Sequence, residues 1–403
     1  MIKTDVCIIG AGPAGSTAAK ILSEKGFDVI LVDKDKFPRD KPCGGGLPVS
    51  VLKRFKYLDS KQFIESYTYT GTAYSPSLKY KADIKRDTPI LATTLRKNFD
   101  NELVKLAIDT GTNFIDGKSV IDIRIDEDKA TVILKDDTKI DAKIVVGADG
   151  VWSFVAKKLG FRGKEYKTTK CVLQEFEVDE KVLDEYFTKS RHCHVHSRFE
   201  NILGYGWVFP KNNHLNIGVG SFGQVDTGLD EKMNLLDCYK SYLQFLQNNN
   251  IIPKNLKDTK IKGGAIPIYP FEKTYGDRVI LIGDAGGFVN SISGEGLYYA
   301  MASGEDAAIV IAEALDVGRF DEGFLSKFQK LWKKDFGKDL RLYYTMIKKQ
   351  RKRDGELVFK IADKDELLSE LIIGIITGEI SINRYKWKII RRYLFVLIKN
   401  RFI

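Results

Sequence analysis

Cysteine is scarce in this sequence and follows no pattern. Five cysteines are spread over 403 residues, and no two of them form a C-x-x-C pair. An odd, scattered set argues against a disulfide framework and against a zinc ribbon. We therefore expect a reducing compartment, the cytoplasm.

Long apolar runs are also missing. The most apolar stretches, Leu367–Ile376 and Tyr393–Ile398, are far shorter than the roughly 20 residues that span a bilayer. Met1–Asp5 leads directly into a predicted strand, so no signal peptide is expected. With 43% hydrophobic and 29% charged residues, the composition is typical of a folded globular protein. The length suggests two or three structural units.

Acidic side chains become rare toward the end of the chain. From Arg341 to Ile403 there are 15 Lys and Arg against 7 Asp and Glu, whereas the first 340 residues have 49 against 47. No nucleic-acid-binding motif accompanies this charge, so a nucleic-acid partner is not expected. Residues 383–403 mix Lys and Arg with aromatic and aliphatic residues, which is typical of a helix on an anionic membrane surface. The alternative is a helix packed on the core with a solvated basic face.

A glycine-rich turn stands between two predicted buried strands. Val6–Ile9 is the first strand, the turn reads Gly10-Ala11-Gly12-Pro13-Ala14-Gly15, and Ser16–Lys25 is the predicted helix. Val29–Val32 is the second strand, and it ends at Asp33. This strand–turn–helix–strand order is the context that a dinucleotide site requires.

Each part of this turn has a physical role in such a site. Gly10 permits the tight turn, Gly12 lets the backbone approach a pyrophosphate, and Gly15 allows close helix–strand packing. The helix N-terminus faces the phosphates with its partial positive charge. Asp33 can accept hydrogen bonds from ribose hydroxyls.

Two further glycine–aspartate turns follow apolar strands. Gly147-Ala148-Asp149-Gly150 follows Ile144–Val146, and Gly283-Asp284-Ala285-Gly286-Gly287 follows Val279–Ile282. Either turn alone is most often a plain strand end. Together with the first motif they are far more specific, because Asp284 can accept hydrogen bonds from a sugar-alcohol chain and the glycines leave room for a ring system.

These three turns, in this order, resemble the flavoprotein monooxygenase superfamily. Within it, Lys41-Pro42-Cys43-Gly44-Gly45, Tyr205-Gly206-Trp207-Val208-Phe209-Pro210 and the stretch from Gly283 to Gly296 resemble the geranylgeranyl reductase family. The similarity is to the archaeal digeranylgeranylglycerophospholipid reductase type, which saturates geranylgeranyl chains of membrane lipids. It covers residues 1–315 well and the remainder only loosely.

The resemblance implies FAD as cofactor, held at thirteen motif positions of which six are glycines. Two departures stand out: Asp33 occupies a position that is often Glu, and Gly294-Glu295-Gly296 replaces three glycines of other members. The implied FAD-binding residues are Gly10, Gly12, Ala14, Gly15, Asp33, Gly44, Gly45, Leu47, Arg96, Val120, Asp284, Gly296 and Leu297.

The resemblance also points to Cys43 as a catalytic residue. An isolated isoprene double bond needs an acid, exclusion of water and orientation before it accepts a hydride. Cys43 is a candidate to donate or relay that proton or to tune the flavin, although most free cysteines are inert.

Tyr205, Trp207 and Phe209 stand at period two, so on a strand they share one face. With Pro210 they are candidates for an apolar wall against a prenyl chain. The alternative is an ordinary aromatic sheet core.

His192, His194 and His196 also alternate, but no carboxylate stands in the repeat and flavin chemistry needs no metal, so a half-exposed strand face is expected. A second G-x-G-x-x-G unit is absent, so a separate nicotinamide domain is not expected. The electron donor is then a transiently bound NAD(P)H, a reduced deazaflavin or a ferredoxin.

The expected fold is α/β plus α+β. Residues 1–65, 93–165 and 266–318 form a Rossmann-type FAD-binding domain. Residues 66–92 and 166–265 form an inserted antiparallel-sheet substrate domain, and 319–403 a helical, basic C-terminal region. The expected activity is FAD-dependent reduction of CH–CH groups in geranylgeranyl lipids, by a protein peripherally associated with the inner face of the cell membrane. The alternatives are a monooxygenase or halogenase of the same superfamily, or a non-catalytic flavin- or lipid-binding protein.

Overall fold

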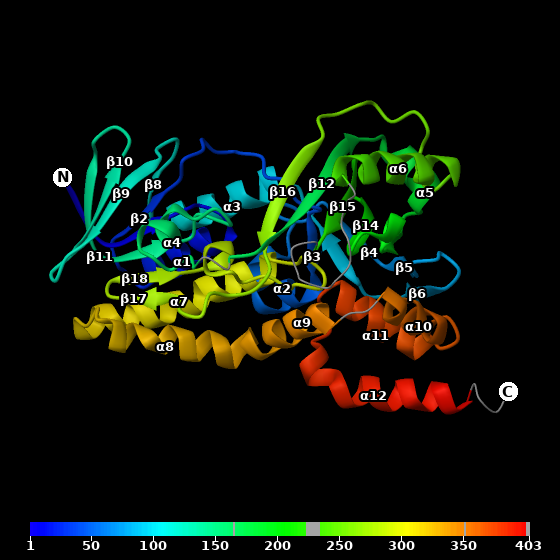
Figure 1. Ribbon diagram of the computed structural model, residues 1–403. Coiled ribbons are helices and arrows are strands. Elements are labelled where there is room, and N and C mark those ends of the chain that lie inside the picture. Colours follow the sequence, from blue (N-terminus) through cyan, green and yellow to red (C-terminus); the bar gives the residue numbers. More distant parts are fainter. Residues whose placement is uncertain (164–165, 223–233, 350–351, 400–403) are drawn as a thin grey trace.

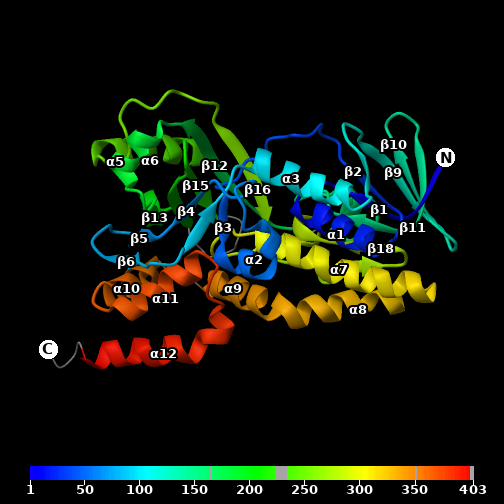
Figure 2. The same ribbon diagram turned by 180° about the vertical axis from the view of Figure 1, so that it is seen from behind.

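Two large sheets lie end to end along the molecule, with helices packed on both (Figure 1). The computed structural model describes all residues except 164–165, 223–233, 350–351 and 400–403. The N-terminus lies at the outer end of the first sheet, and the described C-terminal helix runs beneath the second sheet (Figures 1 and 2). The two sheets thus meet near the middle of the molecule (Figure 1).

The first sheet has a parallel centre, with strands β18, β11, β1, β2 and β8 side by side in that order. Its short inner strands are rich in Val, Ile and Leu and are buried on both faces, which is the usual pattern of a parallel sheet. The strands are β1 (Ile2–Ile9), β2 (Val29–Val32), β8 (Asn113–Ile115), β9 (Val120–Ile125), β10 (Ala130–Leu134), β11 (Lys139–Gly147), β17 (Tyr275–Gly276) and β18 (Val279–Leu281).

Strand β11 differs from the expectation. The sequence indicates two segments, Lys139–Ala142 at the end of a meander and Ile144–Val146 as a separate buried strand. The structure has one nine-residue strand, because its first half pairs antiparallel with β10 while its whole length pairs parallel with β1. Lys143, the polar break between the segments, forms an ion pair with Asp5 at 2.7 Å and leaves the strand continuous.

The two faces of this sheet are covered differently. Val6 and Ile8 of β1 pack with helices α1, α3, α7 and α8, whereas Cys7 and Ile9 face the meander β9–β10 and α4. This alternation follows the period of two along a strand. The helices are α1 (Pro13–Glu24), α3 (Arg96–Asp109), α4 (Phe154–Lys158), α7 (Leu297–Val317) and α8 (Glu322–Trp332).

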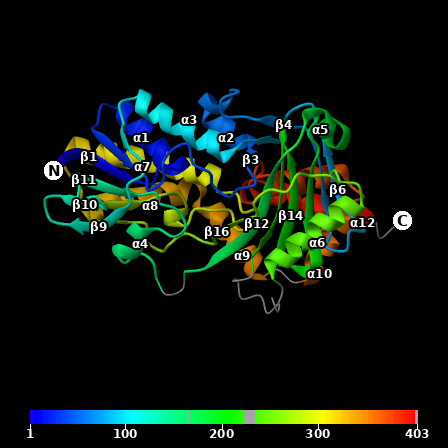
Figure 3. The same cartoon turned by 90° about the horizontal axis from the view of Figure 1, so that it is seen from above.

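The second sheet has seven strands in the order β16-β12-β15-β14-β13-β5-β6. All neighbours are antiparallel except β13 and β5, which run parallel. Helices α5 (Glu180–Phe187) and α6 (Leu235–Asn248) cover one face, as the view from above shows (Figure 3). The strands are β5 (Thr70–Tyr74), β6 (Lys81–Lys85), β12 (Thr168–Glu177), β13 (Cys193–Ser197), β14 (Gly204–Pro210), β15 (His214–Ser221) and β16 (Lys262–Pro267).

The last part of the chain is helical, as expected, and lies beneath the second sheet (Figure 1). Helix α8 continues through a π-helical turn, Lys333–Gly337, into α9 (Lys338–Lys349). Helices α10 (Lys352–Ala362), α11 (Glu366–Ile376) and α12 (Ile382–Lys399) follow, and their apolar sides share a core cluster with β5, β6 and β13. In the described residues no helix is long and apolar enough to cross a membrane.

A small sheet joins the two halves. It contains β3 (Gly46–Pro48), β7 (Leu91–Thr93) and β4 (Ser66–Thr68) in that order, with the short helix α2 (Val49–Arg54) after β3. The fold is therefore the Rossmann-type domain, inserted sheet and helical C-terminal region that the sequence predicts, while the domain boundaries themselves remain a prediction.

Candidate active site

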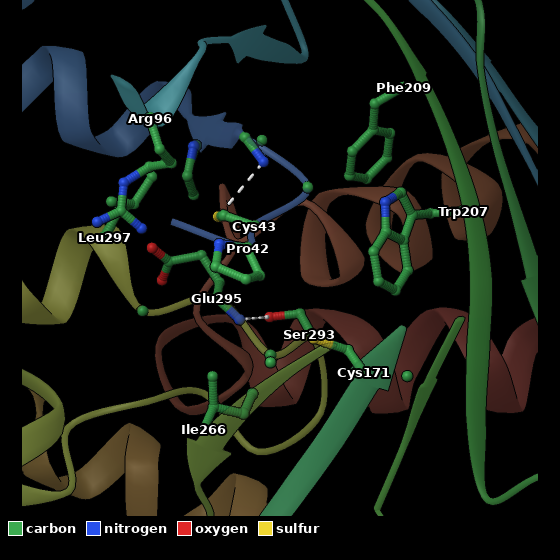
Figure 4. Close-up of a pocket in the computed structure, with 18 of the residues that line it drawn as sticks. Pro42, Cys43, Arg96, Cys171, Trp207, Phe209, Ile266, Ser293, Glu295 and Leu297 are labelled. Atoms are coloured by element: carbon green, nitrogen blue, oxygen red, sulfur yellow. Dashed lines mark hydrogen bonds between the residues drawn. The ribbon is translucent and has the colours of Figure 1, made fainter. Parts of the chain in front are cut away.

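A cavity of about 220 Å³ lies where the two sheets and the C-terminal helices meet. The first domain contributes the glycine-rich turns, the second contributes one face of its sheet, and α11 closes a further side. Figure 4 shows Cys43 and Glu295 on one side of it, and Trp207 and Phe209 on the other. Of the residues predicted from the sequence, the cavity is lined by Gly12, Ala14, Cys43, Gly44, Gly45, Arg96, Tyr205, Trp207, Phe209, Asp284, Gly296 and Leu297.

The β1–α1 turn has the geometry of a dinucleotide site. Gly10 has φ +107°, a conformation that side chains with a Cβ rarely adopt, and a Cβ at Gly15 would lie 1.9 Å from the Gly10 carbonyl oxygen. Pro13 begins α1 directly after Gly12. A Cβ at Gly12 would meet nothing closer than 3.7 Å, so the backbone there borders open space into which a pyrophosphate fits.

Asp33 is buried and held against this turn. Its Oδ2 accepts the Ala11 N–H at 2.7 Å and its Oδ1 accepts the Asp35 N–H at 2.9 Å. The carboxylate oxygens keep further lone pairs, so both bonds leave it able to receive a ribose hydroxyl. The Lys118 N–H donates to the Asp33 carbonyl at 3.0 Å, which places Val120, two residues further on, at the same edge of the sheet.

The loop around Cys43 is fixed by a buried ion pair. The guanidinium of Arg96 donates to both carboxylate oxygens of Asp100 at 2.7 Å, and Arg39 lies 2.9 Å from the same carboxylate. Burial opposes the charge on Arg96, but Asp100 and the neighbouring Cys43 outweigh it and raise the pKa of Arg96. Burial likewise opposes ionisation of Asp100, yet Arg96 and Arg39 lower its pKa. The Cys43 Sγ accepts the Gly45 N–H at 3.4 Å.

Tyr205, Trp207 and Phe209 share one face of β14, as the period-two spacing predicts, and form an aromatic wall of the cavity. Tyr205, Trp207 and Phe209 follow one another with ring centroids 5.8 and 6.4 Å apart. The Trp207 Nε1–H donates to Asn216 Oδ1 at 2.7 Å, and the ring lies against Gly218, where a Cβ would be 2.3 Å away. The wall is thus held by both a hydrogen bond and close packing.

A buried polar network connects this wall to the Cys43 loop, and the sequence does not reveal it. Asn216 Nδ2 donates to the Cys43 carbonyl at 3.2 Å and to Glu175 Oε2 at 2.8 Å. The fully buried Lys211 binds the same Glu175 oxygen at 2.8 Å. No motif marks these residues: the register of β12 against β15 pairs Glu175 with Asn216, and Lys211 stands in the turn between β14 and β15.

Helix α11 also reaches the cavity. Ile373 and Ile376 of the helix, and Thr377 directly after it, line the cavity. The apolar character of Leu367–Ile376 was the available signal, but only the tertiary fold shows which side of the helix faces the cavity.

Six predicted residues lie away from the cavity lining, and two of them, Asp33 and Val120, stand at the sheet edge described above. Gly10 and Gly15 belong to the packing of the β1–α1 turn, Leu47 is fully buried in β3, and Pro210 ends β14. Of the four residues expected to bind the substrate, Tyr205, Trp207 and Phe209 line the cavity, whereas Pro210 does not.

The three histidines lie on the opposite face of the second sheet from the cavity. His196 is buried, stacks on Tyr74 at 4.5 Å and shares a hydrogen bond of 2.8 Å with Tyr242 of α6. The expectation of a half-exposed strand face agrees with His192 and His194, which are half-buried, but is wrong for His196, because α6 covers the strand there. Within the described ranges no three His, Cys, Asp or Glu side chains are grouped to hold a metal ion.

The parallel sheet, the open glycine turn and the adjoining cavity define a flavoprotein of the FAD-binding class. The FAD binding domain family matches residues 3–328. A digeranylgeranylglycerophospholipid reductase of Methanococcus aeolicus is 30% identical over 382 residues, which cover 92% of each chain. A menaquinone reductase of Mycobacterium tuberculosis is 29% identical over 333 residues, or 79% of this chain and 78% of that one.

A solved structure shares the whole fold. A geranylgeranyl bacteriochlorophyll reductase-like protein of Thermoplasma acidophilum superposes with a TM-score of 0.80 at 20% identity, covering 96% of this chain and 99% of that one. The chain belongs to the FAD-binding domain family and, within it, to the geranylgeranyl reductase family. Its cofactor is FAD.

Proposed function

We propose that this protein is an FAD-dependent reductase that saturates the double bonds of geranylgeranyl chains in membrane-lipid precursors, with digeranylgeranylglycerophospholipid as the substrate. The observation that carries the proposal is the composition of the cavity. Its flavin side has the Cys43 loop, Arg96 and Asp284, and its far side is formed by aromatic rings and by Ile373 and Ile376 of α11. An apolar recess beside a flavin site suits a long hydrocarbon chain.

The residues that would hold FAD fit its parts. Gly12 and the N-terminus of α1 suit the pyrophosphate, Asp33 the ribose, and Asp284 with Gly296 and Leu297 the ribityl chain and ring. When bound and reduced, FAD supplies a hydride. The reducing equivalents would come from NAD(P)H, a deazaflavin or a ferredoxin.

The protein's own part is to prepare an unpolarised double bond. Trp207 and Phe209 exclude water and hold the chain flat against the flavin side, and their π faces stabilise positive charge that develops on carbon. The polar network of Asn216 keeps this wall in register with the Cys43 loop. A proton must also reach one carbon of the bond.

Cys43 is proposed to act at the reacting centre, where it relays a proton or tunes the flavin. Replacing it by Ser or Ala should slow chain reduction about 100-fold, the lower range for a lost proton-transfer group, while FAD stays bound. Product formation and flavin absorbance are measured on the same preparation. Full turnover with unchanged FAD would remove Cys43 from the mechanism.

We further propose that α12 rests on an anionic membrane, in keeping with a cytoplasmic protein associated with the inner face of the cell membrane. One face of the helix packs inward through Val396, and Arg392 binds Asp365 at 2.5 Å. The opposite face exposes both apolar and basic side chains, a combination that favours anionic lipid. The exposed residues are Arg384, Lys386, Trp387, Lys388, Ile390, Arg391, Leu394, Phe395, Ile398 and Lys399. Residues 400–403 of the predicted segment lie outside the described residues.

The alternative enzyme is a monooxygenase or halogenase of the same superfamily. A halogenase needs a dedicated lysine near the flavin, and Lys41 and Lys170 both line the cavity. Lys41 lies 3.7 Å from Asp284, so an ion pair already involves it. A non-catalytic flavin- or lipid-binding protein would bind FAD and leave prenyl chains unchanged.

The deciding experiment reduces the bound flavin without oxygen, adds digeranylgeranylglycerophospholipid in detergent, and analyses the lipid by mass spectrometry. The proposal expects lipid that has gained two hydrogen atoms for each reduced double bond. Oxygen-dependent hydroxylated or halogenated products would support the alternative enzymes, and unchanged lipid would support the binding protein.

A further inference from the structure

Glu295 is a carboxyl group in the cavity to which the activity above assigns no role. It stands in the loop Gly294-Glu295-Gly296 before α7, and it lines the same cavity as Cys43, Trp207 and Phe209. Figure 4 shows its side chain extending below Cys43, on the side of the cavity opposite the aromatic wall. We propose that Glu295 is the acid that protonates the prenyl double bond, a catalytic role that rests on the proposed reductase function.

The surroundings of Glu295 favour a carboxyl group that holds a proton near neutral pH. Burial disfavours the charged form, and the negative charge of Asp284 adds to this effect. The N–H groups of Tyr298 and Leu297 act in the opposite direction, and the Tyr298 N–H donates to Oε1 at 2.6 Å. The balance raises the pKa of Glu295 to about 7. A general acid is most effective when its pKa lies near the working pH.

Few charged side chains from other helices, strands and loops face the Glu295 carboxyl group. Asp284, in the turn that follows β18, is itself 3.7 Å from Lys41 of the Cys43 loop. The tyrosines nearby are neutral at pH 7, because burial raises the pKa of each of them. They are Tyr205 of β14, Tyr298 and Tyr299 of α7, and Tyr343 of α9. The protonation of Glu295 is therefore set mainly by burial.

The other groups of the cavity are poorer acids. Burial raises the pKa of Cys171 to about 11 and that of Cys193 to about 12. Burial also raises the pKa of Tyr205, whose hydroxyl already donates to the Ser293 carbonyl. Arg96 is bound by Asp100 and does not release its proton. Cys43 accepts a hydrogen bond from Gly45, which suits a relay or a flavin contact better than a primary acid.

The Glu295 O–H bond breaks, and its proton forms a C–H bond with one carbon of the double bond. The neighbouring carbon receives a hydride from the reduced flavin, which loses two electrons, and the carboxylate of Glu295 then takes a proton from water. One C=C bond thus becomes one CH–CH unit.

Glu295→Gln separates this acid role from a structural one. Glutamine keeps an oxygen that accepts the Tyr298 N–H at the start of α7, but its amide has no acidic proton to transfer. We expect FAD binding and thermal unfolding to be unchanged and chain reduction to fall about 100- to 10,000-fold, the range for a lost general acid. In the wild type the rate should fall above about pH 7 as the carboxyl ionises, and the residual rate of Glu295→Gln should not follow that decline.

Two controls complete the test. Glu313→Gln, on the exposed side of the same helix and paired with Lys327, should leave the rate unchanged. Burial also raises the pKa of Asp306 to about 7, so infrared difference spectra of the FAD-free protein between pH 5 and pH 9 should contain carboxylic-acid bands from both groups that titrate about pH 7. The Glu295→Gln variant should lose the Glu295 band and keep the Asp306 band.

Each outcome has one meaning. Turnover of Glu295→Gln equal to that of the wild type, or infrared difference spectra that are identical in the two proteins, overturns the role of Glu295 and leaves the reductase function standing. A wild type that forms no hydrogenated lipid overturns the reductase function and this role with it.

Discussion

The cavity has a flavin end, formed by the Cys43 loop, Arg96 and Asp284, and a proposed lipid end, formed by Ile373 and Ile376 of α11. Different interactions hold the two ends in place. At the flavin end, directional bonds between buried polar groups fix each loop, as in the pair Arg96–Asp100 and the link from Trp207 through Asn216 to the Cys43 loop. At the lipid end, Ile373 and Ile376 of α11 close the cavity through apolar contact, and the ion pairs of Arg86 with Glu370 and Glu379 lie outside the lining. Chemistry needs positions accurate to fractions of an ångström, whereas a hydrocarbon chain needs only a dry surface of suitable shape.

The largest effect should come from breaking the ion pair at the flavin end. Asp100→Ala leaves the guanidinium of Arg96 buried beside Arg39 without its carboxylate, which costs about 3–5 kcal/mol when a buried pair loses one partner. We expect a lower free energy of unfolding in urea and a lower ratio of FAD to protein. Unchanged values of both would contradict the view that this pair fixes the flavin end.

A smaller effect is expected where the two ends meet. Trp207→Phe keeps an apolar ring but leaves Asn216 Oδ1 without its donor, which should cost about 1–3 kcal/mol. FAD absorbance should persist while the rate of chain reduction falls. If FAD is lost as well, Trp207 belongs to the flavin end and not to the lipid wall.

Acid should weaken the second sheet through its histidines. Burial lowers the pKa of His196 to about 3, from the usual 6.5. Below pH 6.5 this histidine is therefore protonated in the unfolded chain but stays neutral in the folded chain. The contribution of neutral His196 to the free energy of unfolding is fully present above pH 6.5 and is lost as the pH falls toward 3. At pH 5 the loss for this group is about 2 kcal/mol. Urea unfolding at pH 7 and pH 5 measures it, and His196→Gln should reduce the difference.

The smallest effect is expected at the outer surface of the lipid end. Trp387 of α12 is 65% exposed, and Trp387→Ser should leave the free energy of unfolding unchanged but weaken binding to anionic vesicles about tenfold, or about 1.4 kcal/mol. Trp152 is 60% exposed in the first domain, so Trp152→Ser is the matched control. Equal vesicle binding of both variants and the wild type would argue that α12 is only a packing helix.

The sequence predicts the flavin end better than the lipid end, and the reason is physical. In dinucleotide sites the backbone binds phosphate and a carboxylate binds ribose at fixed spacings along the chain, so Gly10, Gly12 and Asp33 can be proposed without a structure. Asn216 and Lys211 act through side chains that strand pairing brings together from distant positions, and no local pattern marks them. The inner side of α11 depends on how the C-terminal helices pack against β5 and β6, which local periodicity does not determine.

The reoxidation of the bound flavin tests the central claim most directly. FAD on the protein is reduced under strict exclusion of oxygen, and its absorbance is followed after addition of a geranylgeranyl lipid or of its fully saturated counterpart. The account predicts that the oxidised flavin spectrum returns with the unsaturated lipid alone. A flavin that stays reduced with both lipids, and reoxidises only when oxygen is admitted, would contradict it.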